Sequence, residues 1–298
     1  MTTFHRGELS AQKRAGVLHE AARLAPMLER PAIPRGARMF LAEQPMLVLG
    51  ATDRDGDPWA TLLTGPPGFL DVDGPSTLTI AATPGPGDPL REALTEPVPV
   101  GMIVIEPDTR RRVRMNGTAH PTPAGLRVEL AQVYGNCPKY IQARVPTRTP
   151  GAPGVAWRGT ELTPADLDFI ATADTFFITT ADLDGNTDAS HRGGNPGFLL
   201  ASGPTRLRWP DYAGNSMFNT FGNLEVNPRA GLLLPDWTTG TLLHLTGSAV
   251  VDWDRAHAAG VPGAQRLVDF TVDRVVRVDN AAGLRWSEAE FSRFNPQM

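Results

Sequence analysis

Residues 53–70 read DRDGDPWATLLTGPPGFL, and residues 182–199 read DLDGNTDASHRGGNPGFL. Aligned with a shift of 129 positions, the two stretches are identical at nine of eighteen positions, where chance gives roughly one. The agreement continues, one residue out of step, at Gly101/Gly231 and Gly117/Gly247. The chain is therefore a tandem duplication of one unit.

Each unit consists of short apolar runs separated by Asp-Gly and Gly-Pro turn signals, which are typical of antiparallel strands. About six strands and one or two helices per unit favour a small, mostly antiparallel barrel. No G-x-G-x-x-G motif opens a helix after a strand, which argues against a Rossmann domain. We expect an N-terminal helical arm over 1–35, a first barrel over 36–147, a linker over 148–160 and a second barrel over 161–298. Helical spacing over 8–30 and 36–44 places two helices ahead of the first strand.

Composition describes a globular protein of 298 residues with 41% hydrophobic and 20% charged residues. A net charge of -4 gives no reason to expect nucleic acid or an anionic membrane as a partner. The chain shows no apolar run of membrane-spanning length and no signal-peptide core. With a single cysteine, Cys137, no intrachain disulfide can form, and we expect a cytoplasmic protein.

The most polar part of the second unit lies between Asp188 and Arg229. We expect strands over 188–194 and 206–209, then a helix over 216–223 that Asn215 caps. Strand alternation puts Ser190 and Arg192 on one face and His191 on the other. Helix N-termini and arginine both favour phosphate, so Ser190, Arg192, Asp211, Asn215 and Ser216 indicate a phosphate site. The first unit has Leu63 where the second has Arg192, so we expect one such site per chain.

The segment 132–144 reads QVYGNCPKYIQAR. Pro138 suits the first position of a helix that Asn136 or Cys137 would cap. Beside Lys139 at a helix N-terminus, Cys137 is either a reactive thiol or a small buried residue. The six histidines form no metal-binding pattern, so we predict no metal. Adjacent strand residues such as Ser190 and His191 cannot form a nucleophile–base pair, and no catalytic residue is assigned.

Three pieces of the second unit resemble the FMN-binding split barrel of the pyridoxamine 5'-phosphate oxidase-like family: DLDGNTDASHRGG, LRWPDYAGNSMFNTFGNLEVNPRAGLLL and LHLTGSAVV. The resemblance covers residues 40–290 as two tandem split β-barrels, a mainly β (α+β) fold with flanking helices. It implies FMN as cofactor, with a lid from unit one over the site of unit two. The implied cofactor-binding residues are Asn136, Lys139, Tyr140, Ser190, His191, Arg192, Gly193, Trp209, Pro210, Asp211, Tyr212, Asn215, Ser216 and Asn219.

The function that this resemblance implies is an FMN-dependent oxidoreductase acting on a small molecule. The electron donor is left open between NAD(P)H and a redox protein. The alternative is a carrier or sensor of flavin, deazaflavin or haem without rapid turnover, with His191 or His5 as the haem ligand. Two units in one chain make an intrachain pseudo-dimer, whether or not the chain also forms a homodimer. The opening FHRGE (4–8) is either a frayed terminus or a strip over a partner's pocket.

Overall fold

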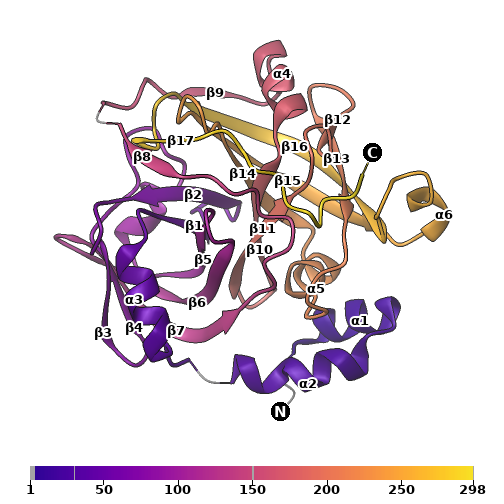
Figure 1. Ribbon diagram of the computed structural model, residues 1–298, viewed down its shortest axis with the longest axis horizontal. Helices are drawn as coiled ribbons and strands as arrows, with labels where there is room; N and C mark the ends of the chain where they lie inside the picture. Colours follow the sequence, from indigo (N-terminus) through magenta and orange to yellow (C-terminus); the bar gives the residue numbers. More distant parts are fainter. Residues whose placement is uncertain (1–3, 30, 150, 298) are drawn as a thin grey trace.

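The computed structural model describes residues 4–29, 31–149 and 151–297. Two antiparallel barrels lie side by side, the first drawn in indigo to magenta and the second in pink to yellow (Figure 1). The mainly β architecture and the tandem arrangement predicted from the sequence are confirmed.

The first unit is a seven-stranded sheet in the order β2-β1-β5-β6-β7-β4-β3. Its strands are β1 (Met46–Thr52), β2 (Pro58–Thr64), β3 (Leu70–Gly74), β4 (Thr77–Ile80), β5 (Val98–Glu106), β6 (Arg111–Thr122) and β7 (Gly125–Gly135). Helices α1 (Arg6–Ala15) and α2 (Leu18–Leu28) precede this unit in the chain, and the unit itself contains α3 (Arg35–Glu43) and the short 3₁₀ turn η1 (Ala93–Thr95). The predicted helix over 36–44 is thus confirmed as α3.

The second unit repeats this order strand for strand, as β11-β10-β14-β15-β16-β13-β12, with β9 (Trp157–Gly159) paired to β16. The strands are β10 (Thr175–Ala181), β11 (Thr187–Gly193), β12 (Leu200–Ala201), β13 (Arg206–Asp211), β14 (Arg229–Pro235), β15 (Leu242–Asp252) and β16 (Arg266–Val278). Its helices are α4 (Pro164–Thr172), α5 (Asn219–Val226) and α6 (Arg255–Ala258). Identical strand order in both units is the structural counterpart of the sequence repeat.

Both sheets have a bulge at the same place in the repeat, at Gly117 on β6 and Gly247 on β15. A Cβ atom on Gly117 would lie 2.1 Å from a backbone oxygen of β7, and one on Gly247 would lie 1.9 Å from a backbone oxygen of β16. Any side chain there would collide with backbone, so the bulge requires glycine in both units.

The two barrels pack through β1, β2 and β5 of one unit and β10, β11 and β14 of the other. A Cβ on Gly101 would lie 2.5 Å from the backbone of Ala189, and one on Gly231 would lie 2.4 Å from that of Pro58. These repeat-related glycines therefore allow the strands to approach closely. One apolar cluster, which includes Ile103 and Phe177, spans the junction.

The N-terminal helix predicted over 8–30 is two helices, α1 and α2, because Gly16 adopts a left-handed conformation with φ of 76° between them. Arg30 lies outside the described residues. Helix α1 lies beside α5 of the second barrel (Figure 1), whereas α3 contacts β3 of the first. The FHRGE segment is not frayed, since His5 caps α1, and a role over a partner's pocket stays a prediction. The proposed domain boundaries remain predictions.

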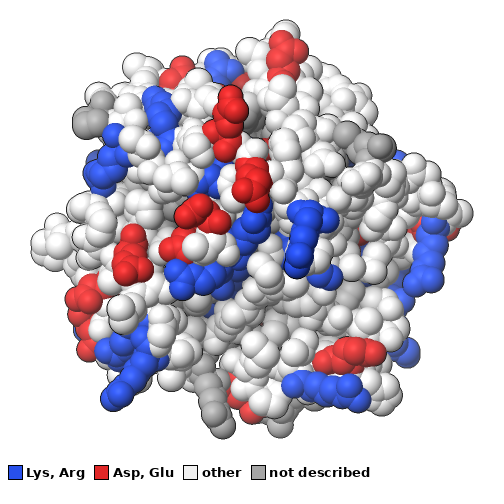
Figure 2. Space-filling view, in the orientation of Figure 1, with Lys and Arg blue, Asp and Glu red and all other residues white. Residues whose placement is uncertain are grey.

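The segment between the units is more ordered than a simple linker. Strand β9, within 148–160, joins the second sheet. Strand β8 (Pro146–Arg148), which ends where this segment begins, pairs with β17 (Leu284–Trp286) near the end of the chain. Acidic and basic side chains are interspersed over the face shown in Figure 2. Among the described residues, no helix has the length and apolar character needed to cross a bilayer.

Candidate functional site

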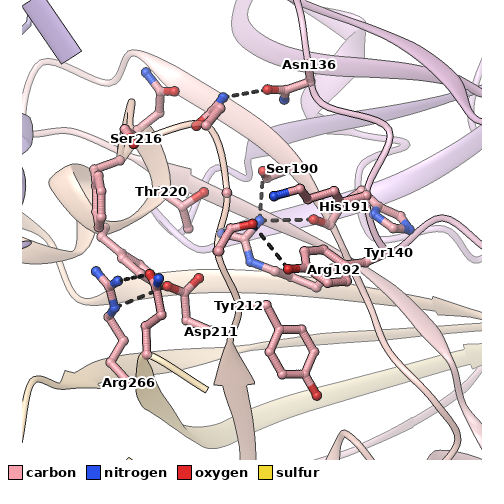
Figure 3. A pocket seen from close by; sticks show the side chains of 18 of the residues that line it. Asn136, Tyr140, Ser190, His191, Arg192, Asp211, Tyr212, Ser216, Thr220 and Arg266 are labelled. Carbon is pink, nitrogen blue, oxygen red and sulfur yellow. Dashed lines mark hydrogen bonds and ion pairs between the residues drawn. The ribbon is translucent and has the colours of Figure 1, made fainter. Parts of the chain in front are cut away.

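A cavity of about 260 Å³ lies between the two barrels, with walls from both units. Of the fourteen residues proposed from the sequence, thirteen line it (Figure 3). They are Asn136, Lys139, Tyr140, Ser190, His191, Arg192, Gly193, Pro210, Asp211, Tyr212, Asn215, Ser216 and Asn219. The structure thus brings together residues that are up to 83 positions apart in the sequence.

Trp209 is the exception and corrects the prediction. It is fully buried in the core of the second barrel, with its ring centroid 5.1 Å from that of Phe176 in an edge-to-face arrangement. Successive strand residues face opposite sides of a sheet, and on β13 the Trp209 side chain takes the inner side. Trp209 is therefore a core residue.

Strand β11 forms one wall of the cavity. Arg192 Nη1 donates a hydrogen bond to Ser190 Oγ at 2.9 Å, as expected for two side chains on one face of a strand. The His191 ring points the other way and packs edge-on against Phe177, at 5.7 Å between ring centroids.

Two arginines that the sequence reasoning missed come from the first barrel. Arg112 and Arg114 lie two residues apart on β6 and line the cavity. Arg114 forms a buried ion pair with Asp188, and Arg112 Nη1 lies 3.3 Å from His191 Nδ1. The run RRRVR at 110–114 was the available signal, because residues 112 and 114 share one face of a strand.

The electrostatics of the cavity favour an anion. Burial and the neighbouring guanidinium groups of Arg114 and Arg192 lower the pKa of Arg112 to about 9. Burial also lowers the pKa of Arg192, although Asp211 partly opposes this. Because arginine stays protonated in proteins, an anionic ligand in the cavity would relieve this repulsion.

Unused hydrogen-bond donors point the same way. The Nε atoms of Arg112 and Arg192 are buried without a hydrogen-bond partner, and within the described ranges neither arginine forms an ion pair with a carboxylate. A buried polar group without a partner costs about 1–3 kcal/mol, and more when it is charged. Two such groups, from different barrels and beside one cavity, fit an anion site.

A second arginine–carboxylate pair closes the other side of the cavity. Arg266 Nε lies 3.2 Å from Asp211 Oδ2, and its guanidinium stacks on the rings of Phe218 and Trp253 at 4.9 and 5.1 Å. Burial raises the pKa of Asp211 above its usual value, and the charges of Arg266 and Arg192 offset only part of this rise. Figure 3 shows this pair across the cavity from Ser190 and Arg192.

Two segments, one from each barrel, meet over the cavity and form its roof: residues 136–140 and 212–218. Asn215 Nδ2 donates to Asn136 Oδ1, Tyr140 Oη donates to the Ala213 carbonyl at 3.2 Å, and the rings of Tyr140 and Tyr212 lie 5.1 Å apart. Among the residues that the structure describes, five non-glycine residues have a positive φ, and three of them are in this roof: Tyr140, Ser216 and Phe218. Such strained conformations concentrate at functional sites.

The roof corrects both predicted helix starts. Helix α5 begins at Asn219 rather than Ser216, and left-handed Phe218 occupies its N-cap position without a side-chain cap. Asn215 instead accepts from the Met217 N–H at 3.1 Å, a local turn that competes with helix formation. No helix follows Pro138 either, because Tyr140 has a φ of 64°. Cys137 is half-buried in this irregular segment.

The equivalent place in the first unit is filled by side chains. Leu63 replaces Arg192, and on β15 the counterparts of Arg112 and Arg114 are Leu242 and His244. His244 is buried and its Nδ1 lies 2.8 Å from the Ala60 carbonyl. The difference between the units that Leu63 predicts therefore extends to a second pair of strands, because β15 lacks the arginines of β6.

We expect His191 to make the protein less stable in acid. Burial, with smaller effects from Arg112 and Arg192, holds its pKa well below 6.5, so folding disfavours the protonated ring. The stability that this provides is complete above the unfolded pKa of about 6.5 and falls below it, by up to ~1.4 kcal/mol per pH unit. Urea unfolding between about pH 5 and pH 7 should show a shallower loss in His191→Gln.

Buried His244 has a pKa that burial lowers in the same direction, so some acid sensitivity should persist in His191→Gln. The matched control is His19→Gln at an exposed position of α2. A pH dependence that is the same in wild type and His191→Gln would contradict the neutral state of the His191 ring.

The fold and the cavity define a two-barrel protein with an arginine-lined pocket at the barrel junction. Residues 162–279 match the family model described as pyridoxamine 5'-phosphate oxidase. The match lies within the second barrel, and there it confirms the resemblance seen in the sequence. No curated protein matches the chain.

Among solved structures, the chain is similar to a protein of Lactobacillus delbrueckii that is provisionally described as a pyridoxamine 5'-phosphate oxidase. The two share 17% identity over 39% of this chain and 93% of that one, with a TM-score of 0.33. It is also similar to a FAD-binding protein of Mesorhizobium loti, with 13% identity over 42% and 97% of the two chains and a TM-score of 0.29. The haem storage protein HutZ of Vibrio cholerae shows 13% identity over 40% and 94%, with a TM-score of 0.28.

Proposed function

We propose that this chain holds one FMN at the barrel junction and works as an FMN-dependent oxidoreductase on a small molecule. The observation that carries the proposal is the pair Arg112 and Arg192, whose buried Nε atoms have no partner. A phosphate group of charge close to -2 would match two guanidinium groups, and arginine binds phosphate in a two-pronged geometry. Ser190, already bonded to Arg192, would complete this cradle.

The residues present fit the rest of the cofactor as well. Tyr140 and Tyr212 offer aromatic faces at the roof, where a planar ring can stack. Asn136 and Asn215 offer amide groups beside them. FMN would supply the electron transfer, while the protein would bind it, orient it and exclude water.

The histidines give little support to the haem alternative. His5 does not line the cavity, its Nδ1 accepts from the Gly7 N–H, and its Nε2 lies 3.0 Å from Asn223 Oδ1. His191 Nδ1 faces Arg112, which can only donate, so the proton of the neutral ring is on Nε2. Neither ring offers a free nitrogen lone pair for iron. A carrier of flavin or deazaflavin without turnover is the remaining alternative.

An absorption spectrum of the purified protein, with mass analysis of the released chromophore, tests the proposal. We expect a flavin spectrum, the mass of FMN and about one FMN per chain, consistent with a single cradle. Rapid reduction of that flavin by NADH, NADPH or a redox protein would distinguish an enzyme from a carrier. A haem spectrum, or failure to take up added FMN, would refute the proposal.

Lys139 should influence the redox behaviour of the bound flavin rather than the fold. It lines the cavity, and its Nζ lies 5.8 Å from the Phe294 ring centroid. A cation near the ring favours the more negatively charged reduced form, so Lys139→Ala should lower the midpoint potential by ~30 mV, or about 1.4 kcal/mol for two electrons. Lys13→Ala, at the only other lysine of the chain, is the control. Identical potentials in all three proteins would refute a role of Lys139 as part of the lid.

A further inference from the structure

The FHRGE segment, which opens helix α1, is packed against residues of both barrels. The Phe4 side chain is 4% exposed and packs in a cluster that contains Tyr134 and Met217. Gly7 lies so close to helix α5 that a Cβ atom there would be 2.1 Å from the carbonyl oxygen of Gly222. The two helices thus cross with their backbones in contact.

Two polar side chains of α1, Glu8 and Gln12, bond to the structure around the cavity. Glu8 Oε1 accepts from Asn219 Nδ2 at 2.7 Å, and Oε2 accepts from the His5 N–H at 2.9 Å. Gln12, which is 1% exposed, donates from Nε2 to the carbonyl of Met217 at 2.9 Å. One helix therefore holds both the first residue of α5 and the roof segment 212–218.

Helix α5 needs this support. It has eight residues, and its N-cap position has no side-chain hydrogen bond. Helices this short are marginal by themselves and depend on tertiary packing, and a missing cap costs about 1 kcal/mol. The residues that α5 presents to the cavity are Asn219, Thr220 and Phe221.

We propose that α1 is a positioning element of the cofactor pocket, in which Gly7, Glu8 and Gln12 fix α5 and the roof. The inference rests on the proposed FMN site for its effect on affinity. Its effect on α5 itself is independent of any ligand. When α1 is displaced, the wall formed by Asn219 and Thr220 loses its fixed position, and the cavity also loses Ala15 and Val17, which line it from the arm.

Gly7→Ala tests the proposal, because the added methyl group cannot fit against Gly222. We expect a rise of about tenfold or more in the FMN dissociation constant, as the loss of the α1 contacts implies, and faster amide hydrogen exchange confined to α5 and the roof. Gly36→Ala is the matched control, since Gly36 is also helical and a Cβ there meets nothing within 4 Å. Equal affinity and equal α5 exchange in the two variants would overturn the proposal.

Gln12→Ala covers the case in which Gly7→Ala does not fold, because it removes one hydrogen bond and adds no atoms. It should speed amide hydrogen exchange in the roof segment and raise the FMN dissociation rate. The midpoint of unfolding should stay close to that of wild type. A destabilised protein with unchanged FMN dissociation would mean that α1 is only structural. If wild type itself takes up no FMN, the proposed function fails, and the exchange measurement still decides the role of α1.

Discussion

Replacing Arg192 with alanine should weaken FMN binding by about 100-fold, and replacing Arg112 together with Arg192 should abolish retention during purification. Each charge-assisted contact contributes about 1.5–3 kcal/mol, and every 1.4 kcal/mol corresponds to a factor of ten in the dissociation constant. The two side chains come from different barrels, β6 and β11, so the double variant removes both sides of the proposed cradle. Fluorescence titration of the apoprotein with FMN measures the effect.

Two further variants separate charge from geometry. Arg192→Lys keeps the charge and loses the planar fork, so its affinity should lie between those of wild type and Arg192→Ala. Arg127→Ala, at an exposed position of β7, is the control and should bind FMN as wild type does. Unchanged FMN stoichiometry in Arg192→Ala would remove the basis for the phosphate assignment.

The second large effect is on stability. Asp188→Ala should lower the free energy of unfolding by about 3–5 kcal/mol, because it leaves the Arg114 charge buried without its partner. Asp188 also accepts a hydrogen bond from the Tyr134 hydroxyl at 3.3 Å, which the variant removes as well. Urea unfolding at neutral pH, followed by circular dichroism, measures the change.

A double variant tests the cause. In Asp188→Leu with Arg114→Met both charges are gone, so most of the lost stability should return, since apolar replacement of a buried ion pair is often nearly neutral. Asp184→Ala, exposed in the turn before β11, should change stability little. Equal stability of Asp188→Ala and wild type would mean that the charge on Arg114 reaches solvent.

The site was predictable to different degrees, for identifiable reasons. Ser190 and Arg192 could be paired from strand alternation, which depends only on local backbone geometry. Arg112 could not be assigned, because its place beside Arg192 depends on how two barrels pack, and no local rule contains that contact. The predicted start of α5 was wrong because Asn215 and Ser216 suit a helix cap and a turn equally well.

The sequence by itself determined the two-unit fold and the asymmetry between the units. The repeat of turn glycines and apolar strands specifies the same strand order twice, and Leu63 against Arg192 shows which unit retains a charged site. Only the tertiary structure decided that barrel one supplies Arg112 and Arg114 and that α1 packs against α5. Contacts between segments far apart in the chain depend on how two packed surfaces meet, and no local pattern of the sequence encodes that.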